Sequence, residues 1–138
     1  MIRARPLSDL QLAILRVLWR ESEATVARVQ EALAPERELA LTTVATVLSR
    51  LESRGVVTRR TEGRQFVYRA AVKEREVQRS MVAALTERLF AGDPTALVHH
   101  LIDEGQIDAD GLARIERMLQ DDGQADPGTP PRGGGNAD

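Results

Sequence analysis

The hydrophobic period of the chain changes at Gly55, and this change restricts the possible folds more than any other feature of the sequence. In LTTVATVLSRLESRG, residues 41–55, apolar side chains recur at the i, i+3, i+4 and i+7 positions of one helical face. These are Val44, Val47, Leu48 and Leu51. Residues 56–70 instead alternate with the period of two that is typical of strands. The sequence therefore predicts a helix followed directly by a β-hairpin.

Two further helices are predicted before this point, because helix-start signals precede apolar stripes. Ser8 and Gln11 have the spacing of a capping box, in which each side chain bonds the backbone N–H of the other residue. Thr25 and Thr42 are predicted to cap the second and third helices, and Gly55 to end the third. The residues expected to face inward are Leu10, Ile14, Leu18 and Trp19, then Val26, Val29 and Leu33.

The hairpin is predicted from strands at 56–61 and 64–70, joined by Glu62 and Gly63 as a two-residue loop. Phe66 and Tyr68 share one face of the second strand, and we expect both to pack on the helices. Three helices followed by a hairpin is the order of a winged helix-turn-helix domain, which we expect over residues 1–72. The predicted fold class is therefore mainly α with a small β-hairpin wing.

Residues 73–121 are expected to form a helical dimerisation domain. Helical periodicity runs from 73 to 90, from 94 to about 104, and from 108 to about 120. These helices carry apolar stripes but little core between them, so a second copy of the chain is the simplest cover. The dimerisation candidates are Val77, Met81, Leu85, Leu97, Leu101, Leu112, Ile115 and Leu119. Residues 122–138 are rich in Gly, Pro and Asp, and we expect a disordered tail.

The charge of the chain is divided between its halves. Residues 1–79 contain 15 basic and 10 acidic residues, a net charge of +5, whereas residues 80–138 contain 4 and 11, a net charge of −7. A basic first half suggests that this half faces a polyanion, although uneven surface charge without function is the alternative.

The third helix has a face suited to the major groove of DNA. Successive helical residues turn by about 100°, so Thr43, Thr46 and Arg50 lie together, opposite Leu48 and Leu51. Threonine methyl and hydroxyl groups can contact base edges, which makes Thr43 and Thr46 candidates for base reading. The candidates for backbone contacts are Thr42, Arg50, Arg54, Arg60 and Arg64.

Other classes of function lack support in the sequence. The chain has no cysteine, no Ser-His-Asp constellation and no phosphate-cradling glycine loop, so we expect no enzymatic activity and no cofactor. His99 and His100 are neighbours and point about 100° apart on a helix, so we expect no metal site. The longest apolar run is five residues, Met81 to Leu85, too short to span a bilayer. We expect a cytoplasmic protein that does not insert into membranes.

Three blocks carry a family resemblance: LSDLQLAILRVLW (7–19), LTTVATVLSRLESRG (41–55) and EGRQFVYRA (62–70). They resemble the penicillinase-repressor family, the BlaI/MecI type of bacterial transcriptional repressor. The resemblance covers about residues 7–120 and is strongest over the first 70. It implies a winged-helix domain, a helical dimerisation domain, and palindromic operators with TACA/TGTA-like half-sites. It places Thr43 and Thr46 at base edges and Arg50 on a phosphate.

The same resemblance implies control of β-lactamase or related resistance or stress genes. It also implies a membrane-bound zinc-peptidase sensor as a partner, which relieves repression by cleaving the repressor. The Asn-Phe bond cleaved in the family aligns with His100-Leu101 here, so this chain departs from the family at that bond, and a different bond or a different inducer is the alternative.

A second hypothesis is that the winged helix is a protein–protein interaction module. The two hypotheses differ in salt dependence. Binding to phosphates makes log K fall linearly with log salt, by about 0.9 per neutralised phosphate, whereas an apolar protein contact responds weakly.

Overall fold

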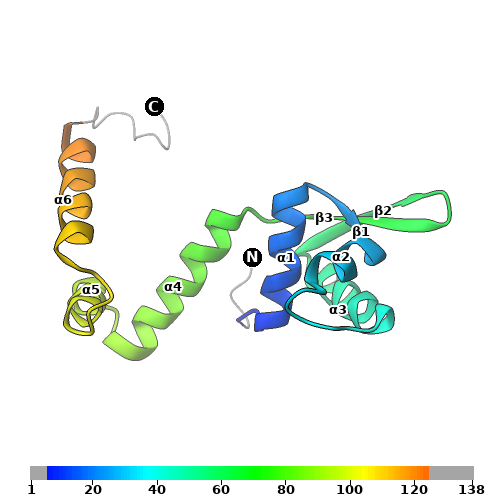
Figure 1. The fold of residues 1–138 in the computed structure, drawn as a ribbon, viewed down its shortest axis with the longest axis horizontal. Helices are drawn as coiled ribbons and strands as arrows, with labels where there is room; N and C mark the ends of the chain where they lie inside the picture. The colour runs from blue at the N-terminus through cyan, green and yellow to red at the C-terminus, as the bar shows by residue number, and fades with distance from the viewer. Residues whose placement is uncertain (1–5, 125–138) are drawn as a thin grey trace. The chain divides into compact units, whose positions relative to one another are not determined.

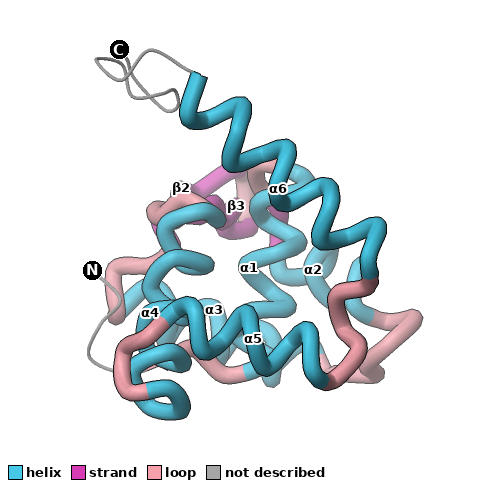
Figure 2. Tube along the Cα trace, turned by 90° about the vertical axis from the view of Figure 1, so that its left-hand side faces the viewer, coloured by secondary structure: helices cyan, strands magenta, loops and turns pink. Residues whose placement is uncertain are grey.

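The structure is a computed structural model that describes residues 6–124 (Figure 1). Within this range the elements follow in the order α1 (Asp9–Glu21), β1 (Ala24–Thr25), α2 (Val26–Leu33), α3 (Leu41–Ser53), β2 (Val57–Glu62), β3 (Gln65–Ala70), α4 (Glu74–Phe90), α5 (Pro94–Asp103) and α6 (Ala109–Gln124). Helices dominate, and the strands gather in one small sheet (Figure 2). No helix in this range is long and apolar enough to cross a membrane.

The first unit of the chain is a winged helix-turn-helix domain, which confirms the predicted fold class. Helices α1, α2 and α3 surround one apolar core, and the antiparallel sheet has the strand order β1-β3-β2. The two-residue strand β1 was not predicted, because it is too short to show alternation. It pairs Ala24 with Tyr68 and Thr25 with Val67. The largest fully buried side chains are Ile14, Leu15, Leu18, Leu48, Leu51, Val17, Val29, Val44, Val56, Val57 and Val77.

Most of the predicted helix boundaries are confirmed. Ser8 caps α1 in a complete capping box with Gln11, and the Thr25 side chain accepts a hydrogen bond from the Arg28 backbone N–H at the start of α2. Gly55 follows α3 with a φ of 78°, in the left-handed region that favours glycine. The prediction that Thr42 caps α3 is wrong, because the N-cap is Ala40, two residues earlier, which makes no side-chain cap bond.

The hairpin differs from its prediction in two details. Glu62 pairs with Gln65, so the turn consists of Gly63 and Arg64 rather than Glu62 and Gly63. Of the two aromatic residues on β3, Tyr68 is 3% exposed and joins the core, whereas Phe66 is 41% exposed. The expected packing of Phe66 on the helices is therefore wrong, because the hairpin extends past the helices toward its tip (Figure 1).

The chain divides into two compact units between Leu85 and Thr86, inside α4, whereas the sequence placed the domain boundary between residues 72 and 73. The first turns of α4 extend the winged-helix unit. Val77 is 1% exposed within its core, and Met81 packs against that core. Val77 is therefore a core residue of this domain and not part of a free dimerisation surface.

The second unit has no apolar core of its own in the part that the structure describes. Its helices match the predicted ranges, except that α6 continues to Gln124 and so includes the first three residues of the predicted tail. The rest of that tail, 125–138, lies outside the described residues. Among residues 86–121, Thr86 and Gly111 are the buried ones, and no apolar side chain is buried. Folding of this unit therefore leaves its apolar stripes accessible.

Candidate nucleic-acid interface

The helix α3 has one fully buried face and one exposed face. Val44, Leu48 and Leu51 are all 0% exposed and lie in the core of the winged-helix domain. Thr43 and Thr46 are exposed on the other side of the helix. The core therefore fixes the rotation of α3 about its axis, and the two threonines face solvent.

The start of α3 is held by a tertiary contact. The Gln30 side chain on α2 donates a hydrogen bond of 2.7 Å from Nε2 to the carbonyl oxygen of Leu39, two residues before α3 begins. Helices α2 and α3 also pack directly on each other. The exposed face of α3 is thus presented by a rigid helix-turn-helix rather than by a loop.

The predicted backbone-binding residues on α3 continue this exposed face. Thr42 and Arg50 are exposed, and Arg54, just after the helix, is half-buried; Ser53, which was not among the predicted contacts, is exposed beside them. In the described part of the chain, no carboxylate forms an ion pair with Arg50. The face therefore has hydroxyl groups at its N-terminal end and positive charge at its C-terminal end, an arrangement that suits base edges and phosphates respectively.

Arg64 lies at the tip of the wing, because it is the second residue of the hairpin turn. It is exposed, and it has no ion-pair partner among residues 6–121, whose side chains the structure describes. Its guanidinium group is available for a phosphate.

Arg60, which the sequence predicts to contact the DNA backbone, forms ion pairs with carboxylates of the protein itself. Its guanidinium group donates to both carboxylate oxygens of Glu23, at 2.6 and 3.1 Å, and to Glu62 at 3.3 Å. The hydrogen bond from Arg60 lowers the pKa of Glu23, and the same contact raises the pKa of Arg60. Because its pKa is lowered, Glu23 stays ionised below the usual glutamate pKa, and the ion pair is lost only as the pH falls through that lowered pKa. Arg60 therefore connects β2 to the segment before β1. The sequence does not predict this contact, because Arg60 and Glu23 are 37 residues apart.

Arg59 also contacts residues of the protein itself, on the wing and on α3. Its guanidinium carbon lies 3.9 Å from the centroid of the Phe66 ring, and its Nε lies 3.4 Å from a carboxylate oxygen of Glu52 on α3. The Phe66 ring in turn meets Tyr68 edge-on, with 6.5 Å between ring centroids. These contacts connect the wing to the end of α3, so the two elements present their outer surfaces together.

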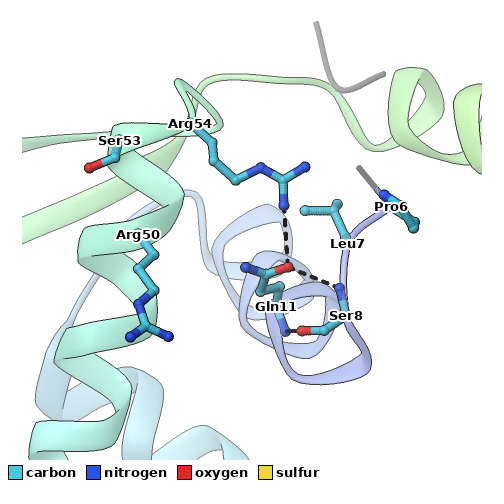
Figure 3. Close-up of a pocket in the computed structure, with 7 residues that line it drawn as sticks. All are labelled: Pro6, Leu7, Ser8, Gln11, Arg50, Ser53 and Arg54. Atoms are coloured by element: carbon cyan, nitrogen blue, oxygen red, sulfur yellow. Dashed lines mark hydrogen bonds between the residues drawn. The ribbon is translucent and has the colours of Figure 1, made fainter. Parts of the chain in front are cut away.

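A hollow of about 710 Å³ lies between the start of α1 and the C-terminal half of α3 (Figure 3). Figure 3 shows Arg54 extending from α3 toward Gln11 at the first turn of α1. Arg54 Nη1 donates to Gln11 Oε1 at 3.4 Å. The sequence did not predict this site, because Gln11 and Arg54 are 43 residues apart. The lining residues are Pro6, Leu7, Ser8, Gln11, Arg50, Ser53 and Arg54.

The predicted dimerisation residues divide into three groups. Val77 and Met81 contact the winged-helix core, as described above. Leu97, Leu101 and Ile115 are half-buried. Leu85, Leu112 and Leu119 are exposed. Further apolar residues outside the list of dimerisation candidates are also exposed: Val82, Leu89, Val98, Ile102 and Met118.

The two histidines contact different partners. His99 Nδ1 lies 3.4 Å from an oxygen of Asp103, whereas the His100 ring is 5.7 Å from the Phe90 ring, measured between centroids. Within the described residues, no three His, Cys, Asp or Glu side chains come together in a way that could hold a metal ion.

Comparison with known proteins identifies related chains. A family model described as penicillinase repressor matches residues 7–121. The transcriptional regulator BlaI of Mycobacterium tuberculosis is 38% identical over 124 residues, which cover 87% of this chain and 89% of that protein. The penicillinase repressor of Bacillus licheniformis is 23% identical over 115 residues, covering 83% and 90%. The solution structure of the DNA-binding domain of the repressor BlaI is 30% identical and covers 54% of this chain and 88% of its own, with a TM-score of 0.47.

Proposed function

Because the chain belongs to the penicillinase repressor family of DNA-binding transcriptional repressors, we propose that it is a dimeric repressor that reads a palindromic operator through α3. The observation that carries the proposal is the two-sided α3, whose apolar face is fully buried while Thr43 and Thr46 are exposed. In this proposal the two threonines contact base edges in a TACA/TGTA-like half-site. Arg50 and Arg64 hold phosphates on either side. The genes controlled are those of β-lactamase or related resistance functions.

The proposal is tested by titrating the protein with two duplexes over a range of salt concentrations. One duplex carries a TACA/TGTA dyad, and the other is a scrambled duplex of the same composition. We expect tighter binding to the dyad, and a log K that falls linearly with log salt for both. A salt-independent affinity would contradict DNA binding and would favour the protein-interaction hypothesis.

The wing is expected to contribute a sequence-independent phosphate contact through Arg64. The Arg64→Ala variant should weaken binding to the dyad and the scrambled duplex by the same factor. It should also make the salt slope shallower by about 0.9, since one phosphate contact is lost. Arg88→Ala removes the same charge from α4 and serves as the control. An unchanged slope in Arg64→Ala would show that the wing tip does not contact the backbone.

We also propose that the second unit forms the dimer. It buries no apolar side chain among residues 86–121, while Leu89 on α4 and Leu112 and Leu119 on α6 are exposed, Leu119 by 67%. Exposed apolar surface of this kind is typical of protein–protein interfaces. In a twofold dimer the same surface of the two subunits meets, so each copy covers the other.

The Leu119→Asp variant tests this dimer. A carboxylate in an apolar interface would be desolvated without a partner, so we expect the variant to sediment as a monomer at concentrations where the wild type is a dimer. Gln120→Asp introduces the same charge at the next position of α6 and should remain dimeric. Equal dimerisation of Leu119→Asp and wild type would contradict the placement of α6 in the interface.

A membrane zinc peptidase remains a proposed partner for the relief of repression. His100-Leu101, the bond that aligns with the family's cleavage site, lies inside α5, with His100 exposed and Leu101 half-buried. A peptidase that cleaves this bond must first unfold part of α5, because a helical backbone does not fit an extended binding cleft. Incubation with the candidate peptidase followed by mass spectrometry of the fragments identifies the bond.

A further inference from the structure

The hollow between α1 and α3 has the composition of an anion site. Of the seven described residues that line it, two are arginines and two are serines, and none carries a carboxylate. Ser8, Arg50 and Ser53 are exposed, so the hollow opens to solvent. Guanidinium and hydroxyl groups donate hydrogen bonds, and a phosphate group offers only acceptors, so the ligand class that matches is a phosphate.

Gln11 contacts one of these donors. Its Oε1 accepts a hydrogen bond of 2.9 Å from the Ser8 backbone N–H and a second of 3.4 Å from Arg54 Nη1. The capping box of α1 and the Arg54 guanidinium group therefore share one acceptor (Figure 3). Through this contact the start of α1 holds the guanidinium group of Arg54, the C-cap residue of α3.

The hollow also continues the exposed face of α3. Thr43, Thr46, Arg50 and Ser53 fall within an arc of about 80° around the helix axis, at about 100° per residue. A helix that enters the major groove by this face brings its C-terminal half, and with it the hollow, toward the phosphates at the edge of the groove. The start of α1 is then the second wall of the same site.

We infer that this hollow holds a backbone phosphate of the operator, gripped between α3 and the start of α1, and that Gln11 is a positioning residue for it. The inference rests on the proposed function and adds a contact from α1 that the α3 and wing contacts do not include. A phosphate held by two elements restricts both the depth and the tilt of α3 in the groove, which a contact from α3 alone does not.

The Gln11→Glu variant separates this role from folding. Glutamate at this position also completes a capping box, so the variant should unfold at the same temperature as the wild type or higher. It places a carboxylate beside Arg54, in competition with the phosphate. We expect the affinity for the dyad duplex to fall by about tenfold or more, and the salt slope to become shallower by about 0.9. Gln106→Glu has the same change in net charge, in the second unit, and should bind as the wild type does.

The bound phosphate is identified with dyad duplexes that each carry one uncharged methylphosphonate. We expect one position in each half-site to weaken the wild type markedly and Gln11→Glu little, because the variant has already lost that contact. If every methylphosphonate weakens Gln11→Glu by the same factor as it weakens the wild type, the hollow holds no particular phosphate and the inference fails. Failure of the wild type to bind either duplex with a salt dependence would instead overturn the proposed function.

A free anion is the other source of the same chemistry. Inorganic phosphate, added at constant ionic strength, should raise the unfolding temperature of the wild type and of Gln11→Glu equally. Stabilisation of the wild type alone, together with no selective methylphosphonate position, would identify a small-anion site and overturn the assignment to DNA.

Discussion

Replacement of Leu48 by alanine is expected to lower the free energy of unfolding of the winged-helix domain by about 2–5 kcal/mol. Leu48 is 0% exposed and lies at the centre of the buried face of α3. Truncation to alanine removes apolar contacts with the core and leaves a cavity that the surrounding helices fill only in part. The loss is a large share of the 5–15 kcal/mol that is typical of a small domain.

Urea denaturation followed by tryptophan fluorescence measures this loss. Trp19 is the only tryptophan, it packs against the same core, and its Nε1 donates to the Val72 carbonyl oxygen at 2.9 Å. Its emission therefore reports the winged-helix unit. Ser49→Ala, at the next and exposed position, should change the free energy of unfolding by less than about 0.5 kcal/mol. An equal urea midpoint for Leu48→Ala and wild type would contradict the buried role of this face.

The sequence predicts α3 well because local and tertiary signals agree there. The spacing of Val44, Leu48 and Leu51 requires one buried helical face, and the structure buries all three. The start of α3 was predicted two residues late because no side chain caps it. Its position follows from the bond between Gln30 and the Leu39 carbonyl oxygen, which links two segments and has no local signature.

The role of α4 could not be predicted from periodicity. Val77, Met81, Leu85 and Leu89 form a single stripe in the sequence, and the structure assigns its first half to the winged-helix core. A stripe shows that a face is covered, but it does not show by which partner. The remaining half, with Leu85 and Leu89 exposed, is the part that a second copy can cover.

The sequence shows which charged residues lie in the candidate site, but it does not show which residues they contact. Arg60 and Arg64 look alike in the sequence of the wing, yet Arg60 pairs with Glu23 while Arg64 occupies the turn. The difference depends on which segment passes beside β2, and that is a property of the tertiary fold. The hollow beside Gln11 was missed for the same reason.

Replacement of Thr46 by alanine is expected to remove about 1–3 kcal/mol of sequence discrimination in each half-site, or about 2–6 kcal/mol for a dimer on a palindrome. Thr46 is exposed, so the substitution opens no cavity, and alanine has a higher helix propensity than threonine. The stability of the domain should therefore be kept or slightly raised while base reading is lost. Contacts to phosphates remain, so binding to scrambled DNA should change little.

The measurement that tests the reading face most directly is the ratio of affinities for the dyad and scrambled duplexes, compared between wild type and Thr46→Ala. Both proteins are titrated at one salt concentration, because each affinity depends on salt. We expect the ratio to fall by about 30-fold or more in the variant, through weaker binding to the dyad alone. An unchanged ratio in a stably folded variant would contradict the assignment of this face of α3 to base reading.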